Sequence, residues 1–389
     1  MKKQINSKYI IAIDAINVQR GGGVTYLVEL LNNIIIEQHN FSKIYIWGSK
    51  STLAKLKNTD WLLKKNHFLL NNNLFFRTIW QLFFLKINLN KYSCQILYVP
   101  GSLFVTNFRP VVTLSQNMLP FQSQEMFRFG ISIMTLKLVC LKILQANSFK
   151  QANGLIFLTN FAKQTISTNI NLRNKNTVVI PHGISKNFFV SSNNRITKLV
   201  YDFENPMNII YVSIIDEYKH QINVLKAISL LRSQGYQINI KFVGPAYKPT
   251  LNRFIKYKNS VDPDHAFSEY VGTVNYDELP KHIFSSDVFL FASSCENLPN
   301  ILLEGMASSI PILCSNMGPM PEILGDSGIY FDPLFPNSIA EAIKTSYLTP
   351  GLFRHLSNTS FEKANTYSWD KCTRDTFNFI ESTYLNYKK

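Results

Sequence analysis

The sequence predicts an α/β protein made of two doubly wound, Rossmann-like domains, each built on a parallel sheet. The chain has 389 residues, 46% of them hydrophobic. Its length exceeds the ~250–300 residues beyond which a single core rarely grows. Short β-branched stretches alternate with stretches of helical spacing, and the alternation restarts midway. We expect an N-terminal domain over 1–187, a C-terminal domain over 188–365 and a final helix, 366–389, packing back across the domains. The carboxyl ends of both sheets should face a central cleft, where ligands bind.

The first predicted element is the apolar, β-branched stretch Tyr9–Ala15, which is typical of a buried parallel strand. A glycine-rich loop, Gln19–Gly23, separates it from helical spacing over Val24–Glu37. The repetition of strand and helix predicts a parallel sheet. The later strands predicted in this domain are Lys43–Trp47, Ile96–Val99, Val111–Ser115, Leu155–Leu158 and Thr177–Ile180.

The polar stretch Ser191–Arg195 follows the segment Pro181–Phe189, and we expect the domain boundary near it. Beyond it the alternation restarts. The predicted strands are Asn208–Ile215, Ile238–Val243, Tyr270–Val271, Val288–Ala292 and Pro311–Cys314. The predicted helices are Val224–Gln234, Thr250–Lys258, Leu279–Ser285 and Asn300–Ser308. The amphipathic stretch Trp369–Asn386 predicts a terminal helix packed on the body.

The net charge of +15 is concentrated in the first half of the chain. Residues 1–186 contain 22 Lys and Arg against 5 Asp and Glu, a net charge of +17, whereas residues 187–389 contain 18 against 20. Such a basic domain should attract a membrane surface, a phosphorylated lipid or a nucleic acid. Nucleic acid is disfavoured as a partner, because the chain has no helix-turn-helix, zinc or RNA-binding aromatic pattern.

The five cysteines have no metal-binding spacing, so we expect buried free thiols in a reducing cytoplasm. The first apolar stretch, Tyr9–Ile13, is shorter than the ~7–15 residues of a secretory signal. The longest one, Ile131–Leu144, is interrupted by Lys137 and Lys142 and is shorter than the ~20 residues of a spanning helix. The sequence thus predicts a cytoplasmic protein, peripheral on the inner face of the plasma membrane.

The stretch Asp287–Ala307 carries the most informative pattern in the chain. A buried strand ends in small polar residues, Glu296 lies in the next turn, and Pro299 precedes a helix. We expect Pro299 at the first helical position, where its missing N–H costs nothing. The amides of Asn300 and Ile301 at the start of the helix then suit a phosphate.

Glu304 lies eight residues after Glu296, in the first or second turn of the same predicted helix. One carboxylate can face a sugar and the other a ribose, with a diphosphate between them. Two glutamates at this spacing are a weak signal alone, but the stretches Ser308–Asn316 and Gly318–Asp326 follow them. The combined pattern resembles the C-terminal signature of glycosyltransferase family 4, retaining enzymes of the GT-B fold. The resemblance is strong across Asn208–Pro333, weaker elsewhere, and closest to polysaccharide and O-antigen members.

This resemblance implies roles for residues of the second domain. Glu296 would contact the donor sugar, and Glu304 would bind the ribose hydroxyls. Lys219 matches the lysine of the family's phosphate-binding pair, whereas Ile214 stands at the usual arginine position. One of the two cations is therefore missing, unless His220 or a first-domain residue replaces it. Lys219 and the amides at the helix start would stabilise the leaving diphosphate, which would accept the acceptor's proton.

In the first domain, Gly22 and Gly23 match the family's glycine loop, where backbone amides approach a diphosphate or an acceptor closely. The resemblance implies that these two glycines bind the donor. A tight turn explains these glycines equally well. Gln116 or Asn117 takes the place of a histidine that many relatives carry near the reacting sugar. An amide can hydrogen-bond a sugar hydroxyl but cannot be a general base, which fits a mechanism with no protein base at that point.

No metal or other cofactor is expected. The sequence Asp262-Pro263-Asp264 resembles the Asp-x-Asp metal motif of the other large glycosyltransferase fold. In that fold the motif follows a buried strand, whereas here it follows a polar loop. We therefore predict a turn at this position.

Two segments, Leu74–Lys86 and Met126–Leu144, mix aromatic or apolar residues with basic ones. Segments of this kind can lie in a membrane interface, or they can bury their aromatic rings in the core. Together with the basic charge, they indicate a first domain on an anionic inner leaflet. A polyprenyl-diphosphate-linked glycan acceptor would be met there.

The sequence therefore predicts a retaining hexosyltransferase that moves a sugar from a nucleotide sugar to a lipid-linked glycan of the cell envelope. The donor would be GDP-, UDP- or dTDP-linked, and GDP-mannose is the first choice because the stretch Glu296–Asn300 resembles mannosyl- and rhamnosyltransferases. An inactive GT-B scaffold is an alternative, although both glutamates and Lys219 argue against it. A GT-B sugar-nucleotide epimerase would not need a basic acceptor domain, and a phosphorylase would be a much longer chain.

Overall fold

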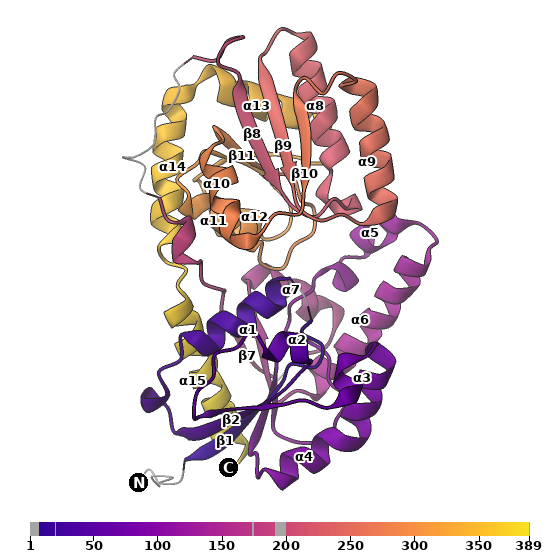
Figure 1. The fold of residues 1–389 in the computed structure, drawn as a ribbon, viewed down its shortest axis with the longest axis vertical. Coiled ribbons are helices and arrows are strands. Elements are labelled where there is room, and N and C mark those ends of the chain that lie inside the picture. The colour runs from indigo at the N-terminus through magenta and orange to yellow at the C-terminus, as the bar shows by residue number, and fades with distance from the viewer. Residues whose placement is uncertain (1–7, 20, 173–174, 191–199, 389) are drawn as a thin grey trace. The chain divides into compact units, whose positions relative to one another are not determined.

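The computed structural model describes residues 8–19, 21–172, 175–190 and 200–388, which form two compact units (Figure 1). The first unit comprises Met1–Phe121, Ile133–Gly183 and Ser368–Lys389, and the second comprises Gln122–Ser132 and Ile184–Tyr367. The boundary after Gly183 lies close to the expected one. Residues 122–132 differ from the expected division, since they join the second unit. The final helix, expected to pack back across the domains, belongs to the first unit. The predicted linker Ser191–Arg195 lies largely outside the described residues.

The first unit contains a seven-stranded parallel sheet with the strand order β3-β2-β1-β4-β5-β6-β7. Its strands are β1 (Tyr9–Asp14), β2 (Phe41–Trp47), β3 (Leu62–Lys65), β4 (Ile96–Val99), β5 (Val111–Leu114), β6 (Gly154–Phe157) and β7 (Asn176–Val179). Its helices are α1 (Gly22–Asn32), α2 (Lys50–Leu53), α3 (Leu74–Trp80), α4 (Lys86–Lys91), α6 (Ile133–Gln151), α7 (Asn160–Asn169) and α15 (Trp369–Tyr387). A π-helical turn, Gln81–Leu85, joins α3 to α4. The order reverses between β1 and β4, which is where a doubly wound sheet binds ligands.

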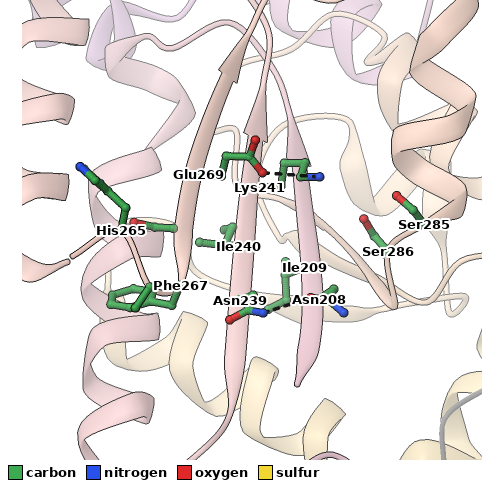
Figure 2. A pocket seen from close by; sticks show the side chains of 12 residues that line it. Asn208, Ile209, Asn239, Ile240, Lys241, His265, Phe267, Glu269, Ser285 and Ser286 are labelled. Carbon is green, nitrogen blue, oxygen red and sulfur yellow. Dashed lines mark hydrogen bonds and ion pairs between the residues drawn. The ribbon is translucent and has the colours of Figure 1, made fainter. Parts of the chain in front are cut away.

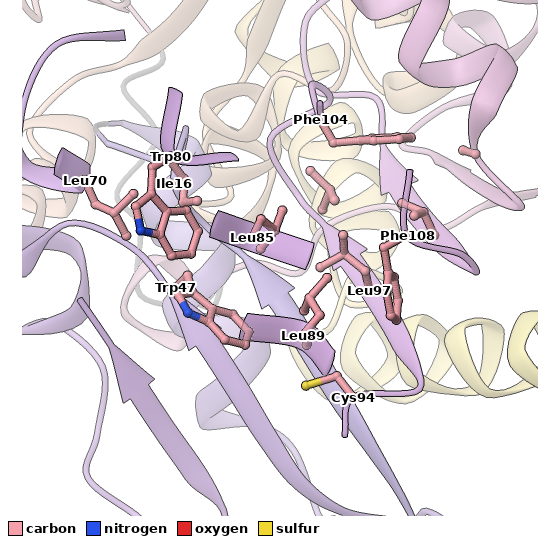
Figure 3. Close-up of a cluster of buried hydrophobic side chains, with 14 residues drawn as sticks. Ile16, Trp47, Leu70, Trp80, Leu85, Leu89, Cys94, Leu97, Phe104 and Phe108 are labelled. Carbon is pink, nitrogen blue, oxygen red and sulfur yellow. The ribbon is translucent and has the colours of Figure 1, made fainter. Parts of the chain in front are cut away.

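The core of the first unit lies beside this sheet and holds α3 and α4 against it (Figure 3). Trp47 and Leu97 of the strands pack with Trp80, Leu85 and Leu89 of the helical segment, and all five are buried. Strands β4, β5 and β6 are buried along their whole length, as expected of parallel strands covered on both faces. The helical segment is thus fixed to the sheet along one side.

The second unit contains a six-stranded parallel sheet with the order β10-β9-β8-β11-β12-β13. Its strands are β8 (Met207–Val212), β9 (Ile238–Val243), β10 (Ser268–Gly272), β11 (Val288–Phe291), β12 (Ile312–Ser315) and β13 (Ile329–Phe331). Its helices are α5 (Ser123–Met126), α8 (Gln221–Ser233), α9 (Lys248–Val261), α10 (Leu279–Phe284), α11 (Asn300–Ala307), α12 (Met320–Leu324), α13 (Pro336–Leu348) and α14 (Pro350–Ala364). Here the strand order reverses between β8 and β11.

Three structural expectations need correction. The first helix ends at Asn32 and does not continue to Glu37, because the Asn33 side chain donates to the Glu29 carbonyl at 2.8 Å and caps the helix. The short edge strands β3 and β13 were not predicted. Cys140 is exposed, whereas the other four cysteines are buried and all five are free. No helix of the described part is long and apolar enough to span a bilayer.

Candidate active site

The candidate site of the second unit lies where its strand order reverses. Strands β8 and β11 are hydrogen-bonded neighbours, and the loops after their carboxyl ends carry Lys219 and Glu296. Ligands of doubly wound sheets bind at this kind of position. The main chains of the two loops are joined directly, because the Ser294 amide donates to the Tyr218 carbonyl at 2.9 Å.

Lys219 and Glu296 form an ion pair between these loops. The Lys219 side chain is mostly buried, and its ammonium lies 5.1 Å from the ring centroid of Tyr218 and 5.3 Å from that of Phe291. The Tyr211 hydroxyl donates to the Lys219 carbonyl at 2.6 Å and holds the backbone in place. The structure thus brings one predicted cation and one predicted sugar-contacting carboxylate together in a fixed, partly desolvated pair, a suitable arrangement for stabilising developing charge.

Glu304 lies in the second turn of α11 and is only 5% exposed. One carboxyl oxygen, Oε1, accepts a hydrogen bond of 2.8 Å from the Tyr276 hydroxyl. The other, Oε2, is buried and has no hydrogen-bond partner in the described part of the chain. Burial raises the pKa of Glu304 to about 8, although the Tyr276 bond lowers it. A buried acceptor left without a donor is costly, and a hydroxyl-bearing ligand would satisfy it.

The start of α11 differs by one position from the prediction. Pro299 is the N-cap, with extended backbone angles, and Asn300 is the first helical residue. The amides of Leu302 and Leu303 both donate to the Pro299 carbonyl. Asn300 and Ile301 precede them, so they still lie at the positive end of the helix dipole, as predicted for a phosphate site.

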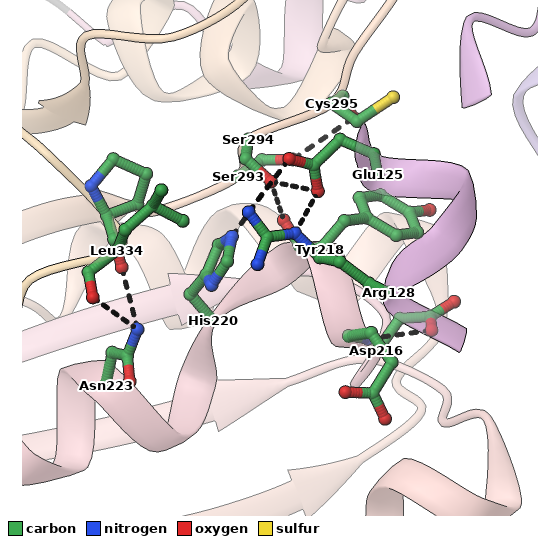
Figure 4. Close-up of polar contacts among 12 residues, drawn as sticks. Glu125, Arg128, Asp216, Tyr218, His220, Asn223, Ser293, Ser294, Cys295 and Leu334 are labelled. Atoms are coloured by element: carbon green, nitrogen blue, oxygen red, sulfur yellow. Dashed lines mark hydrogen bonds and ion pairs between the residues drawn. The ribbon is translucent and has the colours of Figure 1, made fainter. Parts of the chain in front are cut away.

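A polar network that the sequence did not predict fixes the turn before Glu296 (Figure 4). Glu125 comes from α5, a helix that lies between β5 and α6 in sequence but belongs to the second unit. Its carboxylate accepts from the Ser294 hydroxyl at 2.7 Å and forms a bidentate pair with Arg128. The Ser294 hydroxyl also lies 2.8 Å from His220 Nε2. Both sides of the Lys219–Glu296 pair are therefore anchored to Glu125.

In the ligand-free chain, His220 does not carry the positive charge of the missing arginine. Burial, followed by the charge of Arg128, lowers the pKa of His220 to about 4, although Glu125 raises it. The imidazole is therefore neutral at pH 7. Arg128, which the sequence order places among first-domain residues, does line the same pocket as His220, but Glu125 balances its charge. Ile214 itself is only partly buried.

In the first unit, the glycine loop and Gln116 come together at the carboxyl edge of the sheet. Gly21 is the N-cap of α1 and has a φ of 64°, a conformation that favours glycine, while Gly22 and Gly23 form the first turn. A Cβ atom on Gly23 would lie 3.1 Å from Gln116 Oε1. The Gln116 Nε2 amide is buried without a hydrogen-bond partner among the residues that the structure describes.

Asn17 adds a second unsatisfied amide to this edge of the first unit. Its Oδ1 atom is buried without a partner within the described ranges, and a Cβ on Gly101, after β4, would lie 3.4 Å from the Asn17 side chain. Asn117, in contrast, uses its Oδ1 to accept from the Leu119 amide at 3.1 Å in its own turn. Gln116 and Asn17 thus each keep an unsatisfied amide atom, whereas the Asn117 oxygen is used within its own turn.

Two other polar places of the second unit have different roles. A cavity of about 410 Å³ lies at the amino ends of β8, β9 and β10, where Lys241 and Glu269 form an ion pair (Figure 2). This is the sheet edge opposite to the one that binds ligands in doubly wound folds.

Asp262 forms a turn, as predicted, by accepting from the amides of Ala266 and Ser268. Burial tends to raise the pKa of Asp262, but these hydrogen bonds and that of the Ser268 hydroxyl lower it.

The complete fold matches solved glycosyltransferase structures. Sucrose-phosphate synthase from Thermosynechococcus elongatus gives a TM-score of 0.77, covering 97% of this chain and 100% of that one at 14% identity. HepE from Anabaena, in complex with UDP-glucose, gives a TM-score of 0.70, covering 96% and 99% at 13% identity. At such identities the likeness concerns the fold alone. The predicted fold of two Rossmann-like domains, GT-B, is confirmed.

The sequence comparisons concern the second unit. Residues 199–362 match the family model of glycosyl transferases group 1. O-antigen chain mannosyltransferase B of Escherichia coli is 31% identical over 110 residues, 28% of this chain and 29% of that protein. Sulfoquinovosyl transferase SQD2 of Arabidopsis thaliana is 26% identical over 162 residues, 39% of this chain and 30% of its own length. The match thus spans less than a third of these relatives, and it relates the second unit to group 1 glycosyl transferases.

Proposed function

We propose that the protein is a retaining glycosyltransferase that moves a hexose from a nucleotide sugar to a lipid-linked glycan of the cell envelope. The observation that carries the proposal is Glu304, a buried carboxylate whose Oε2 lacks a donor, at the ligand-binding edge of the second sheet. A ribose supplies the hydroxyl donors that this oxygen needs. Among the matched structures, HepE is named in complex with UDP and with UDP-glucose.

The Lys219–Glu296 pair gives the proposed site its chemistry. Glu296 would hold a hydroxyl of the donor sugar, which would free Lys219 to face the diphosphate. Asn300 and Ile301 at the helix start would add backbone donors to the same phosphate. On this arrangement the protein supplies positioning and charge stabilisation, and the leaving diphosphate takes the proton of the acceptor. The proposed reaction needs no metal.

In the first unit, the backbone amides of Gly22 and Gly23 would approach the donor, whereas Gln116 and Asn17 would contact the acceptor or the transferred sugar. Two unsatisfied amide groups at one sheet edge suit a ligand rich in hydroxyl groups. The lipid-linked character of the acceptor rests on the basic charge of this unit, whose 24 Lys and Arg and 7 Asp and Glu give +17. We place the protein on the cytoplasmic face of an anionic membrane for the same reason.

The proposal is tested by calorimetric binding of GDP-, UDP- and dTDP-linked sugars to the wild type and to Glu304→Ala, with GDP-mannose first. Glu341→Ala, at an exposed position of α13 in the same unit, is the matched control. Binding of one donor that is lost in Glu304→Ala and kept in the control supports the proposal. If the folded wild type binds none of these donors, the proposed function is wrong and an inactive scaffold is favoured. Nuclear magnetic resonance of the product's anomeric centre then decides between retention and inversion.

A further inference from the structure

We infer that the exposed aromatic segment, residues 68–87, is the surface by which the first unit rests on an anionic lipid bilayer. The segment runs through α3, the π-helical turn and the start of α4. Its exposed apolar side chains are Phe68, Leu74, Phe75, Phe76, Leu82, Phe83, Phe84 and Ile87. The inference gives the proposed membrane association a defined contact surface, and it does not depend on the donor chemistry.

The aromatic rings of this segment are exposed and do not fill the core. Phe75 is 68% exposed and Phe83 is 65% exposed, whereas Trp80 and Leu85 of the same segment are buried. Of 23 large apolar side chains exposed in the described part of the chain, eight fall in these 20 residues. Because the other side of the segment is packed in the core, the exposure is a property of the folded unit. Exposed apolar groups gathered in this way mark interaction sites.

The two exposed groups of the segment, Leu74–Phe76 and Leu82–Phe84, are eight residues apart. In a regular α-helix that spacing would rotate one group roughly 80° away from the other. The second group lies within the π-helical turn Gln81–Leu85, whose wider winding reduces this rotation.

The charge around this segment selects an anionic bilayer. Between residues 61 and 124 the sequence has six Lys and Arg and neither Asp nor Glu. Lys86 and Lys91 are exposed at the end of the segment. Apolar residues flanked by lysines are the composition of interfacial anchors, with the rings among the acyl chains and the ammonium groups at anionic headgroups. A second copy of this unit would instead bring two charges of +17 together.

The aromatic segment is tied to the ligand-binding edge of the first sheet. Gln81 Nε2 donates to Asp14 Oδ2 at 2.6 Å, and Arg77 donates to the Ile16 carbonyl at 3.1 Å. Asp14 ends β1, and the loop that follows leads to Asn17 and the glycine turn. A segment held at the bilayer would therefore hold this loop close to the headgroups. There the sugar of a lipid-linked acceptor would be presented, a consequence that rests on the proposed function.

The test is flotation of the full chain with vesicles of phosphatidylcholine alone or of an equimolar mixture with phosphatidylglycerol. Phe75→Ser/Phe83→Ser removes the apolar contact, and K86E/K91E reverses the charge. Their matched controls are Phe335→Ser and Lys281→Glu, at exposed positions of the second unit.

We expect the wild type to bind both vesicle types, the anionic one more tightly, and the controls to match it. The double serine variant should lose binding ~100-fold or more on both vesicle types. The charge variant should lose at least ~25-fold on anionic vesicles only, since each lysine near such a surface contributes about fivefold. High salt should weaken the wild type toward the level of the charge variant.

Several results overturn the inference. They are a wild type that does not float, variants that float like the wild type, and controls that lose binding equally. A wild-type dimer that dissociates in the serine variant would assign the segment to a second copy. Tighter binding to single-stranded RNA than to vesicles would assign it to nucleic acid. Vesicle binding needs no donor, so a failed donor titration would leave this inference standing, and failed flotation would leave the donor site untouched.

Discussion

The proposed contact between Glu304 and the ribose predicts that nucleotide-sugar binding depends on pH, and the direction follows from the surroundings of this carboxyl group. Burial raises the pKa of this carboxyl group to about 8 in the free protein. A ribose that donates hydroxyl groups to the carboxylate favours the ionised form, so binding should release a proton. Only about 1% of Glu304 is ionised at pH 6, against about half at pH 8. The dissociation constant should therefore tighten ~50-fold between these values, equivalent to ~2.3 kcal/mol.

Calorimetry checks this prediction in two buffers of different ionisation enthalpy, with a nucleoside diphosphate sugar as the ligand, because its phosphates do not titrate between pH 6 and 8. We expect release of close to one proton per bound nucleotide near pH 6.5. Glu304→Gln should bind weakly and without pH dependence. Tyr276→Phe removes the hydrogen bond that lowers the pKa of Glu304, so it should move the pH dependence to higher values. A wild-type affinity that is constant, or that weakens as pH rises, would refute the reasoning.

The same group gives a stability test that needs no ligand. The folded-state pKa of Glu304 is above its unfolded value, so its contribution to stability is complete below pH ~4.5 and is lost as pH rises through ~8. The difference between the folded and unfolded pKa values corresponds to a loss of at most ~5 kcal/mol. Urea unfolding at several pH values should show the decline in the wild type and a flatter profile in Glu304→Gln. If the free energy of unfolding fell equally with pH in the two proteins, the raised pKa of Glu304 would be contradicted.

Three further changes test the rest of the two units. Lys219→Met leaves Glu296 without its cation and should lower the rate of nucleotide release ~10²–10³-fold at saturating donor, with partial rescue by Lys219→Arg; an unchanged rate would remove Lys219 from the site. Gly23→Ala places a methyl group 3.1 Å from Gln116 Oε1 and hinders the close approach of a ligand to the glycine loop, so calorimetric donor affinity should fall about tenfold, and an unchanged affinity would count against a donor role for this loop. Glu125→Gln should lower the free energy of unfolding by ~1–3 kcal/mol in urea, whereas a neutral effect would mean that the buried network adds no stability.

The sequence predicted the fold well because buried parallel strands carry a strong local signal. The predicted strands Ile96–Val99 and Ile238–Val243 match β4 and β9 in both bounds. The strands that were missed lie at sheet edges, where only one neighbour pairs with them and a continuous apolar run is not required. Leu62–Lys65, for example, ends in two lysines. Edge strands of this kind are defined by their neighbours and not by their own composition.

The candidate site was predictable only where its residues lie close together in the sequence. Glu296 and Glu304 belong to one strand–turn–helix unit, so their spacing could be interpreted directly. Tyr276, which donates to Glu304, comes from the loop after β10 and has no local signal. Asn17 also has no local signal, because the burial of its unsatisfied oxygen depends on β1 and β4 being neighbours. Long-range contacts of this kind depend on strand order, which single-sequence patterns do not encode.

Glu125 shows why the division of the chain matters for its chemistry. The charge count assigns this residue to the basic first domain, where it is the only acidic residue between positions 61 and 201. In the structure it is buried in the second unit. The Ser294 hydroxyl donates to it and also lies within hydrogen-bonding distance of His220. A buried carboxylate needs partners, and Arg128 with Ser294 supplies them. Glu125, the one acidic residue in this basic interval, thus belongs to the second unit, where it fixes the turn that leads to Glu296. The part of this interval that belongs to the first unit contains no acidic residue.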